Sequence, residues 1–263
     1  MGINAGVSAV TGVYLGDQLL TKGGEVTIKT FAEMAPGPSE LKGGDWDCGY
    51  FGVPTTAEMG IITGTGTGAD GQPITATSLA TAFNVAEGMM INSDIIWHKF
   101  VFKGEIIYIP QKTIRESISF NELAKKSLVY GAQVLKTDLA KFKVTLLKGF
   151  HSDIYGAPYS NGSSSKDYGE LSEYDMLLRG ISTKPYKTDF GLKIPEADLE
   201  MPWRGGGKGC WVKEIGYQHI TNPDTRVQYE TKQSTRYTDY SYSAGLSVKS
   251  SSYAWRPALR FTL

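Results

Sequence analysis

Two apolar runs joined by a two-residue turn constrain the fold more than any other feature of this chain. Residues 97–102 (WHKFVF) and 105–110 (EIIYIP) each have the length of a β-strand, and Lys103-Gly104 lies between them. Two such runs separated by a Gly-containing pair are a typical hairpin signal, because Gly readily adopts the positive φ that tight hairpin turns need. The sequence therefore predicts an antiparallel pair of strands over residues 97–110.

A second hairpin is predicted close to the N-terminus. Residues 13–15 and 18–20 flank Gly16-Asp17, which suits a type II′ turn, and residues 26–31 alternate as a third strand would. A hairpin of this size is only marginally stable alone, so it needs a partner surface in its own chain or in another. Two interpretations stay open. The hairpin is either an edge of the main sheet or part of a docking segment, residues 1–40, with the candidate contact residues Val13, Tyr14, Leu15 and Leu19.

Three segments have the spacing of amphipathic helices, at residues 78–90, 119–128 and 171–181. The second of them begins with a capping-box pattern, Ser119 followed three positions later by Glu122. Further strands are expected at residues 210–215, 237–242 and 255–263. Short strands and a few helices in this order indicate the α+β class.

Charge and composition argue against several classes of protein. Lys and Arg number 27 and Asp and Glu number 27, so the chain lacks the basic excess of an electrostatic nucleic-acid binder. No apolar run approaches the 18 residues of a membrane span, and residues 1–6 do not resemble a signal peptide. Gly contributes 31 of 263 residues, about 12%, against a usual share of about 7%. This excess favours turns and short strands over long helices.

Catalytic, metal and cofactor signatures are not found in the sequence. The histidines His98, His151 and His219 form no zinc motif, and we expect His98 to be exposed or held by a hydrogen bond. The glycine-rich stretches 64–71, read as a flexible loop, and 205–209 lack the spacing of a phosphate-binding loop. We therefore predict no catalytic residue, no resident metal and no cofactor.

The two cysteines and one acidic pair leave alternatives open. Two buried free thiols at Cys48 and Cys210 are favoured over one long-range disulfide, and either thiol would need a nearby base to act as a nucleophile. Asp45 and Asp47 lie on either side of Trp46 and could contribute to a calcium site, although the run is equally typical of a turn that holds a buried Trp. Neither feature by itself defines a site.

Aromatic residues gather in the last quarter of the chain. Residues 203–263 contain ten aromatic side chains, several of them Tyr that alternates with polar residues. Tyr and Ser together form rigid, adaptable contact surfaces, as in antibody loops. We therefore consider Tyr237, Tyr240 and Tyr242 as a candidate recognition surface, against the alternative that these rings pack on a sheet.

Several segments, taken in order, resemble virion proteins of tailed bacteriophages. Residues 13–19 (VYLGDQL) are similar to a short opening motif of such proteins, and residues 97–123 are similar to a W-x-K-F hairpin followed by an R-x-x-I-S helix start. Residues 172–178 (SEYDMLL) resemble a helix of the same proteins. Residues 252–261 (SYAWRPALRF) are similar to their closing strand, which also occurs in C-type-lectin-like domains.

This resemblance implies a virion structural protein with an α+β, C-type-lectin-like domain. Calcium-dependent sugar binding does not carry over, because only Asn222-Pro223-Asp224 resembles the lectin turn and the later W-N-D is missing. The oxidase activity of the related formylglycine-generating enzymes does not carry over either, because Cys48 and Cys210 lack the close spacing of the cysteine pair in those enzymes.

The sequence thus leads to one hypothesis and two alternatives. Residues 1–40 would dock the chain on a phage particle assembled in the host cytoplasm, and residues 41–263 would form the displayed lectin-like domain of a non-enzymatic fibre, collar or decoration protein. Its expected partners are other virion proteins and further copies of itself, with no nucleic acid and no membrane insertion. The alternatives are an adhesin that recognises a host-surface glycan or protein, and a lectin-fold oxidase or cell-wall hydrolase.

Overall fold

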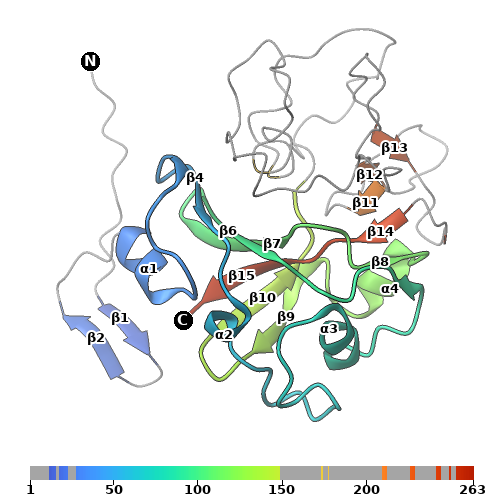
Figure 1. The fold of residues 1–263 in the computed structure, drawn as a ribbon, viewed down its shortest axis with the longest axis horizontal. Helices are drawn as coiled ribbons and strands as arrows, with labels where there is room; N and C mark the ends of the chain where they lie inside the picture. The colour runs from blue at the N-terminus through green and yellow to red at the C-terminus, as the bar shows by residue number, and fades with distance from the viewer. Residues whose placement is uncertain are drawn as a thin grey trace, which may run out of the picture.

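A computed structural model describes the backbone of residues 12–15, 18–22, 28–148, 173, 177, 209–211, 226–228, 241–243, 249 and 253–263. Side chains are placed over 28–148, at positions 173, 177, 211 and 249, and over 254–263. Within these residues short helices combine with mainly antiparallel sheets, so the expected α+β class holds at that level (Figure 1).

A seven-stranded antiparallel sheet forms the centre of the molecule (Figure 1). Its middle is the predicted hairpin over 97–110, with Trp97 opposite Pro110 and Phe102 opposite Glu105. Lys103 and Gly104 both have positive φ, at 48° and 81°, which is the conformation of a type I′ turn. In spatial order the strands are β3 (Gly43–Gly44), β4 (Cys48–Gly52), β6 (Trp97–Phe102), β7 (Glu105–Pro110), β15 (Ala258–Thr262), β10 (Lys141–Thr145) and β9 (Tyr130–Lys136).

A second sheet shares the C-terminal stretch with the first. Its strands, in spatial order, are β13 (Ser241–Ser243), β12 (Arg226–Gln228), β11 (Gly209–Trp211), β14 (Tyr253–Trp255), β8 (Arg115–Glu116) and β5 (Met89–Met90). The strand predicted over 255–263 is in fact two strands, β14 and β15, separated by Arg256 and Pro257. Pro cannot donate a ladder hydrogen bond, so the chain leaves one sheet here and enters the other.

Four short helices lie in the described part of the chain. They are α1 (Ile28–Met34), α2 (Thr56–Met59), α3 (Ala76–Ala82) and α4 (Phe120–Lys125). The prediction of one helix over 78–90 is wrong in extent, because α3 is capped by Thr75 and ends before Asn84 and Gly88, whose φ values of 50° and 77° are not helical. Residues 89–90 instead form the edge strand β5.

The predicted third strand over 26–31 is also wrong from residue 28 onward, where α1 begins. Tertiary packing decides this, since Phe31 lies 5.0 Å from Phe261 between ring centroids and Ala32 is fully buried. The expected N-terminal hairpin is confirmed as β1 (Gly12–Leu15) and β2 (Gln18–Lys22), and neither strand joins either of the two larger sheets (Figure 1).

The central strands are buried on both faces. Every residue of β6 is buried. In β9 exposed residues alternate with half-buried or buried ones, and in β10 exposed Lys141 and Lys143 alternate with buried residues, so both strands turn one face to solvent. On one face the core joins the sheet to the helices, and its largest fully buried members include Trp211, Trp255, Tyr108, Phe51 and Phe142. On the other face lie Glu173 and Leu177, both helical and buried.

Candidate functional site

Lys99 ties helix α1 to the centre of the sheet. Its side chain is fully buried, and Nζ donates to the carbonyl oxygens of Ala32 at 2.8 Å and Ala35 at 2.9 Å. These carbonyls lie at the C-terminal end of α1, where a cation is favoured. Burial lowers the pKa of Lys99 to about 8, against the opposing effect of Glu58. All of this describes a structural lysine.

His98 belongs to a buried polar pair on the opposite face of the same strand. Its Nδ1 lies 3.0 Å from the Tyr50 hydroxyl, while Nε2 has no hydrogen-bond partner among the described residues. Burial, followed by the positive charge of Arg256, lowers the pKa of His98 to about 4, so the imidazole is neutral at pH 7. The expectation of a hydrogen-bonded histidine is met by one of its two ring nitrogens.

Arg260 is a second buried polar centre, and it is bonded to two carboxylates and a hydroxyl. It forms ion pairs with Glu105 and, at 2.6 Å, with Glu173, and its Nε donates to Thr145 Oγ1 at 3.1 Å. Glu173 also accepts from the backbone N–H of Lys148 at 2.8 Å. The guanidinium is thus matched by two carboxylates, and the cluster joins β15, β10 and Glu173.

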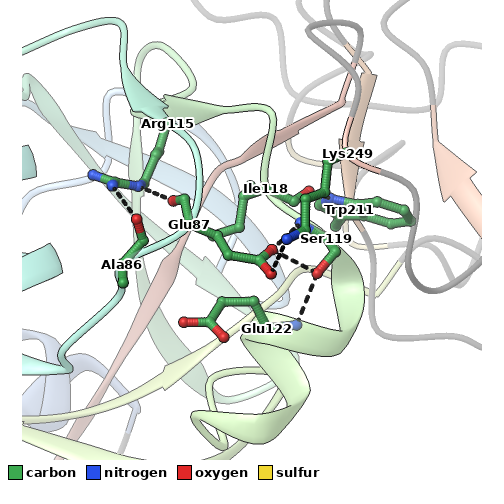
Figure 2. A network of polar contacts seen from close by, with 8 residues as sticks. All are labelled: Ala86, Glu87, Arg115, Ile118, Ser119, Glu122, Trp211 and Lys249. Atoms are coloured by element: carbon green, nitrogen blue, oxygen red, sulfur yellow. Dashed lines mark hydrogen bonds and ion pairs between the residues drawn. The ribbon is translucent and has the colours of Figure 1, made fainter.

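A polar network fixes the start of helix α4 (Figure 2). Ser119 Oγ accepts from the Glu122 backbone N–H at 3.1 Å, which is the N-cap half of the predicted capping box. The other half differs from the prediction, because Glu87 and not Glu122 accepts from the Ser119 backbone N–H, at 3.1 Å, and from the Ser119 hydroxyl, at 2.7 Å. Glu87 also pairs with Lys249 at 2.6 Å. Figure 2 shows Arg115 directed toward the carbonyl groups of the neighbouring loop and Trp211 beside Ile118, to whose carbonyl its Nε1 donates at 2.8 Å.

The candidate docking residues are placed by their backbone alone. Val13, Tyr14 and Leu15 lie on β1 and Leu19 lies on β2. Tyr14 and Leu19 are direct cross-strand partners and therefore share one face of the hairpin. The structure thus brings two of the four residues together.

The candidate recognition surface is placed at one position only. Tyr242 lies on β13, at the edge of the six-stranded sheet and opposite Val227. Tyr237 and Tyr240 lie outside the described residues. Of the strand predicted over 237–242, the structure thus describes only the end, where Ser241 and Tyr242 belong to β13.

The Cys48 thiol is free and half-buried. Burial, and then the charges of Asp45 and Asp47, raise the pKa of Cys48 to about 11, so it is protonated at pH 7 and a poor nucleophile. Asp45 Oδ1 accepts from the backbone N–H groups of Asp47 and Cys48, both at 2.9 Å, which is the turn geometry that competed with a calcium site. Cys210 lies on β11, opposite Gln228 and Ala254.

The loop at 64–71 is more regular than the glycine-rich sequence indicates. Asp70 accepts from the backbone N–H groups of Thr65 at 2.9 Å and Gly66 at 3.0 Å and from the Thr65 hydroxyl at 2.8 Å. These hydrogen bonds hold the pKa of Asp70 below its usual value. The expectation of a flexible loop is replaced by a turn organised around one carboxylate.

Sequence reasoning missed an exposed surface on strands β9 and β10. Val134 is 43% exposed and Leu139, in the turn between the strands, is 60% exposed. Lys136, Lys141 and Lys143 are also exposed. The alternation of lysine with apolar residues over 141–144 (KFKV) was the available signal, because a strand with one solvent face has this pattern.

Over the part of the chain that the structure describes, no group of three or more His, Cys, Asp or Glu side chains could hold a metal ion. The described helices include none with the length and apolar character to cross a membrane. Compared with known proteins, the chain matches no family model, no curated protein and no solved structure.

Proposed function

We propose that this chain is a non-enzymatic structural component of a tailed-bacteriophage particle, of the fibre, collar or decoration type. Residues 41–263, joined by α1, would form a displayed domain with a C-type-lectin-like arrangement. The chain's partners would be other virion proteins and further copies of itself.

The observation that carries this proposal is the way in which three resemblance motifs meet. The motif at 97–110 forms β6 and β7, and β7 pairs with β15 of the closing motif, with Leu259 opposite Tyr108. The motif at 114–123 contains β8, which pairs with β14 of the same closing motif, with Trp255 opposite Arg115. Motifs that are separated by more than a hundred positions in sequence are thus neighbours in space, as a shared scaffold requires.

The described charges support a structural rather than a catalytic role. Arg260 is matched by carboxylates, Lys99 by carbonyls, and Cys48 is protonated. A nucleophile or general base needs a pKa near the working pH and also access to a substrate. The pKa of Lys99 is about 8, but its side chain is fully buried and its Nζ is bonded to the Ala32 and Ala35 carbonyls. These side chains are instead arranged to hold elements together.

The docking role falls to the part of residues 1–40 that precedes helix α1. From Ile28 onward this segment packs on the main sheet, where Tyr108 donates to the Pro36 carbonyl at 2.6 Å. The β1–β2 hairpin pairs with no other strand of the described chain and carries Val13, Tyr14, Leu15 and Leu19. An apolar hairpin of this size needs a surface to pack on.

Particle incorporation tests the proposal directly. Particles purified by density gradient are analysed by quantitative peptide mass spectrometry, and we expect the full chain at a fixed number of copies per particle. A variant that lacks residues 1–27 should stay folded by circular dichroism and be lost from particles. A full chain that is missing from purified particles would overturn the proposal.

The same material addresses the adhesin alternative. Purified full chain is incubated with intact host cells, together with a variant in which Tyr237, Tyr240 and Tyr242 are changed to Ala. Binding that is lost in the variant would assign receptor recognition to the Tyr-rich end. Binding to particles but not to cells would assign a purely structural role.

A further inference from the structure

The seven-stranded sheet has two edges that are open in the described structure, and they carry opposite charges. In the order of its strands, β3 lies at one edge and β9 at the other. At an edge, every second residue directs its N–H and C=O groups away from the sheet, which makes the strand able to pair with another chain. The two edges therefore have the properties of two halves of one contact.

The β9 edge is already used for pairing at one end. The Lys136 carbonyl accepts from the Thr63 N–H at 3.0 Å, and Ile62 bridges Thr137. Lys136 therefore directs its backbone outward, and by the alternation of a strand so does Val134. Val134 has no such partner among the described residues, and its side chain is 43% exposed. The β9 edge is thus paired at Lys136 and Thr137 and open at Val134.

The face next to this edge is basic. Lys136 lies directly opposite Lys141 across the β9–β10 pair, and Lys143 lies two residues along from Lys141 on the same face. None of the three forms an ion pair within the described part of the chain. Like charges directly opposite one another destabilise a sheet, so this arrangement would be relieved by an anionic neighbour.

The β3 edge is acidic at the turn that follows it. Asp45 and Asp47 are exposed, and neither has an ion-pair partner among the residues described. The nearby lysines are directed elsewhere, since Lys103 Nζ lies over the Phe102 ring at 5.6 Å and Lys42 Nζ lies against Gly52. Strand β3 itself is Gly43-Gly44, which presents backbone without side chains. The β3 edge therefore offers the negative charge that the β9 edge lacks, together with a backbone that carries no side chains.

We infer that the β3 edge of one copy of this chain docks against the β9 edge of a second copy and continues the seven-stranded sheet. Asp45 and Asp47 of one copy would face Lys136, Lys141 and Lys143 of the next. The same lysines repel a second β9 edge, so they select the acidic edge over symmetric pairing. This inference deepens the proposed role as a self-associating particle component by naming the surfaces in contact.

A contact between two different edges is head-to-tail. Such contacts generate a ring if the rotation closes and a filament if it does not. Each copy uses both edges, so association proceeds beyond a dimer and increases with protein concentration.

The test is a charge swap measured by sedimentation velocity on the full chain. We expect concentration-dependent association of the wild type. Asp47→Lys and Lys143→Glu should each raise the dissociation constant by at least about tenfold, because like charges then face each other. An equimolar mixture of the two variants should regain association. The unaltered acidic edge of Lys143→Glu meets the unaltered lysine face of Asp47→Lys to give a heterodimer, and growth beyond the dimer requires that the two reversed surfaces also pair. Both positions are exposed, and circular dichroism checks that both variants fold.

Matched controls change the same charges elsewhere. Asp94→Lys and Lys29→Glu alter exposed residues that belong to neither edge strand and should associate like the wild type. A wild type that stays monomeric at every concentration would overturn the inference, as would swap variants that behave like the controls or a mixture that stays dissociated. Because no particle is involved, this result is independent of the incorporation experiment.

Discussion

At the scale of single residues, the polar side chains of the interior differ in how completely they are satisfied. Lys99 donates to at least two carbonyls, and Arg260 bonds two carboxylates and a hydroxyl. His98 bonds only the Tyr50 hydroxyl through Nδ1 within the described structure. A buried group with one side unsatisfied is costly, and it becomes more costly when it gains a charge. His98 is therefore where acid should act first on this face.

His98 predicts a loss of stability in mild acid. Its pKa is about 4 in the folded chain against 6.5 as the ordinary value, so the unfolded chain binds the extra proton first as pH falls. The contribution of neutral His98 to stability is therefore fully present above pH 6.5 and is lost as the pH falls toward 4. This loss lowers the free energy of unfolding by about 3 kcal/mol. Urea unfolding of the wild type and His98→Gln, measured from pH 7 to pH 4, isolates this contribution from that of the carboxylates. Parallel pH curves for the two proteins would contradict it.

At the scale of elements, turn chemistry was predictable and helix extent was not. The hairpin over 97–110 and the N-cap at Ser119 follow from local residues, and both are confirmed. Helix α1 replaced a predicted strand because Phe31 and Ala32 pack into the core and Lys99 binds its last carbonyls, contacts that join residues more than sixty positions apart. The spacing of apolar residues within a short segment cannot predict such long-range contacts.

The candidate surfaces show the same limit. Tyr14 and Leu19 share a hairpin face, as the turn at Gly16-Asp17 predicts. The basic face of β9 and β10 was missed because its lysines become neighbours only when Lys136 pairs with Lys141. A search for motifs along the sequence does not detect charged residues that become neighbours only through strand pairing.

Two glycines with nearly equal dihedral angles separate backbone strain from steric conflict. Gly88 and Gly104 have φ values of 77° and 81°. A Cβ at Gly104 would have nothing within 4 Å, whereas at Gly88 it would lie 2.1 Å from the Glu116 carbonyl oxygen. Gly104→Ala should cost about 1 kcal/mol of stability from the left-handed conformation alone. Gly88→Ala should cost about 1–3 kcal/mol more, because β5 and β8 must move apart.

Urea unfolding at pH 7 measures both variants under the same conditions, so Gly104→Ala serves as the control for Gly88→Ala. Equal losses of stability would show that the loop before β5 can yield to a methyl group. The prediction would then be wrong in its assignment of a rigid contact between residue 88 and strand β8.

At the scale of the whole molecule, one C-terminal stretch links the two sheets. Strand β14 pairs with β8 and β11, and after Arg256 and Pro257 strand β15 enters the other sheet between β7 and β10. Trp255 and Leu259, one on each strand, are both fully buried. Strand β15 lies inside the sheet and pairs with residues more than a hundred positions earlier, so folding depends on contacts between distant segments and both sheets should unfold together.

Paired truncations test this dependence. Removing residues 258–263 deletes β15 from the middle of the seven-stranded sheet and exposes partners that are now buried, including Phe142 and Tyr108. We expect the cooperative thermal transition to be lost in circular dichroism. Removing residues 1–27 deletes a hairpin that joins neither larger sheet, and the transition should persist. The N-terminal truncation removes far more residues, so size alone predicts that it is the more damaging of the two. A cooperative transition that is kept without residues 258–263 but lost without residues 1–27 would contradict the prediction that β15 supports the core.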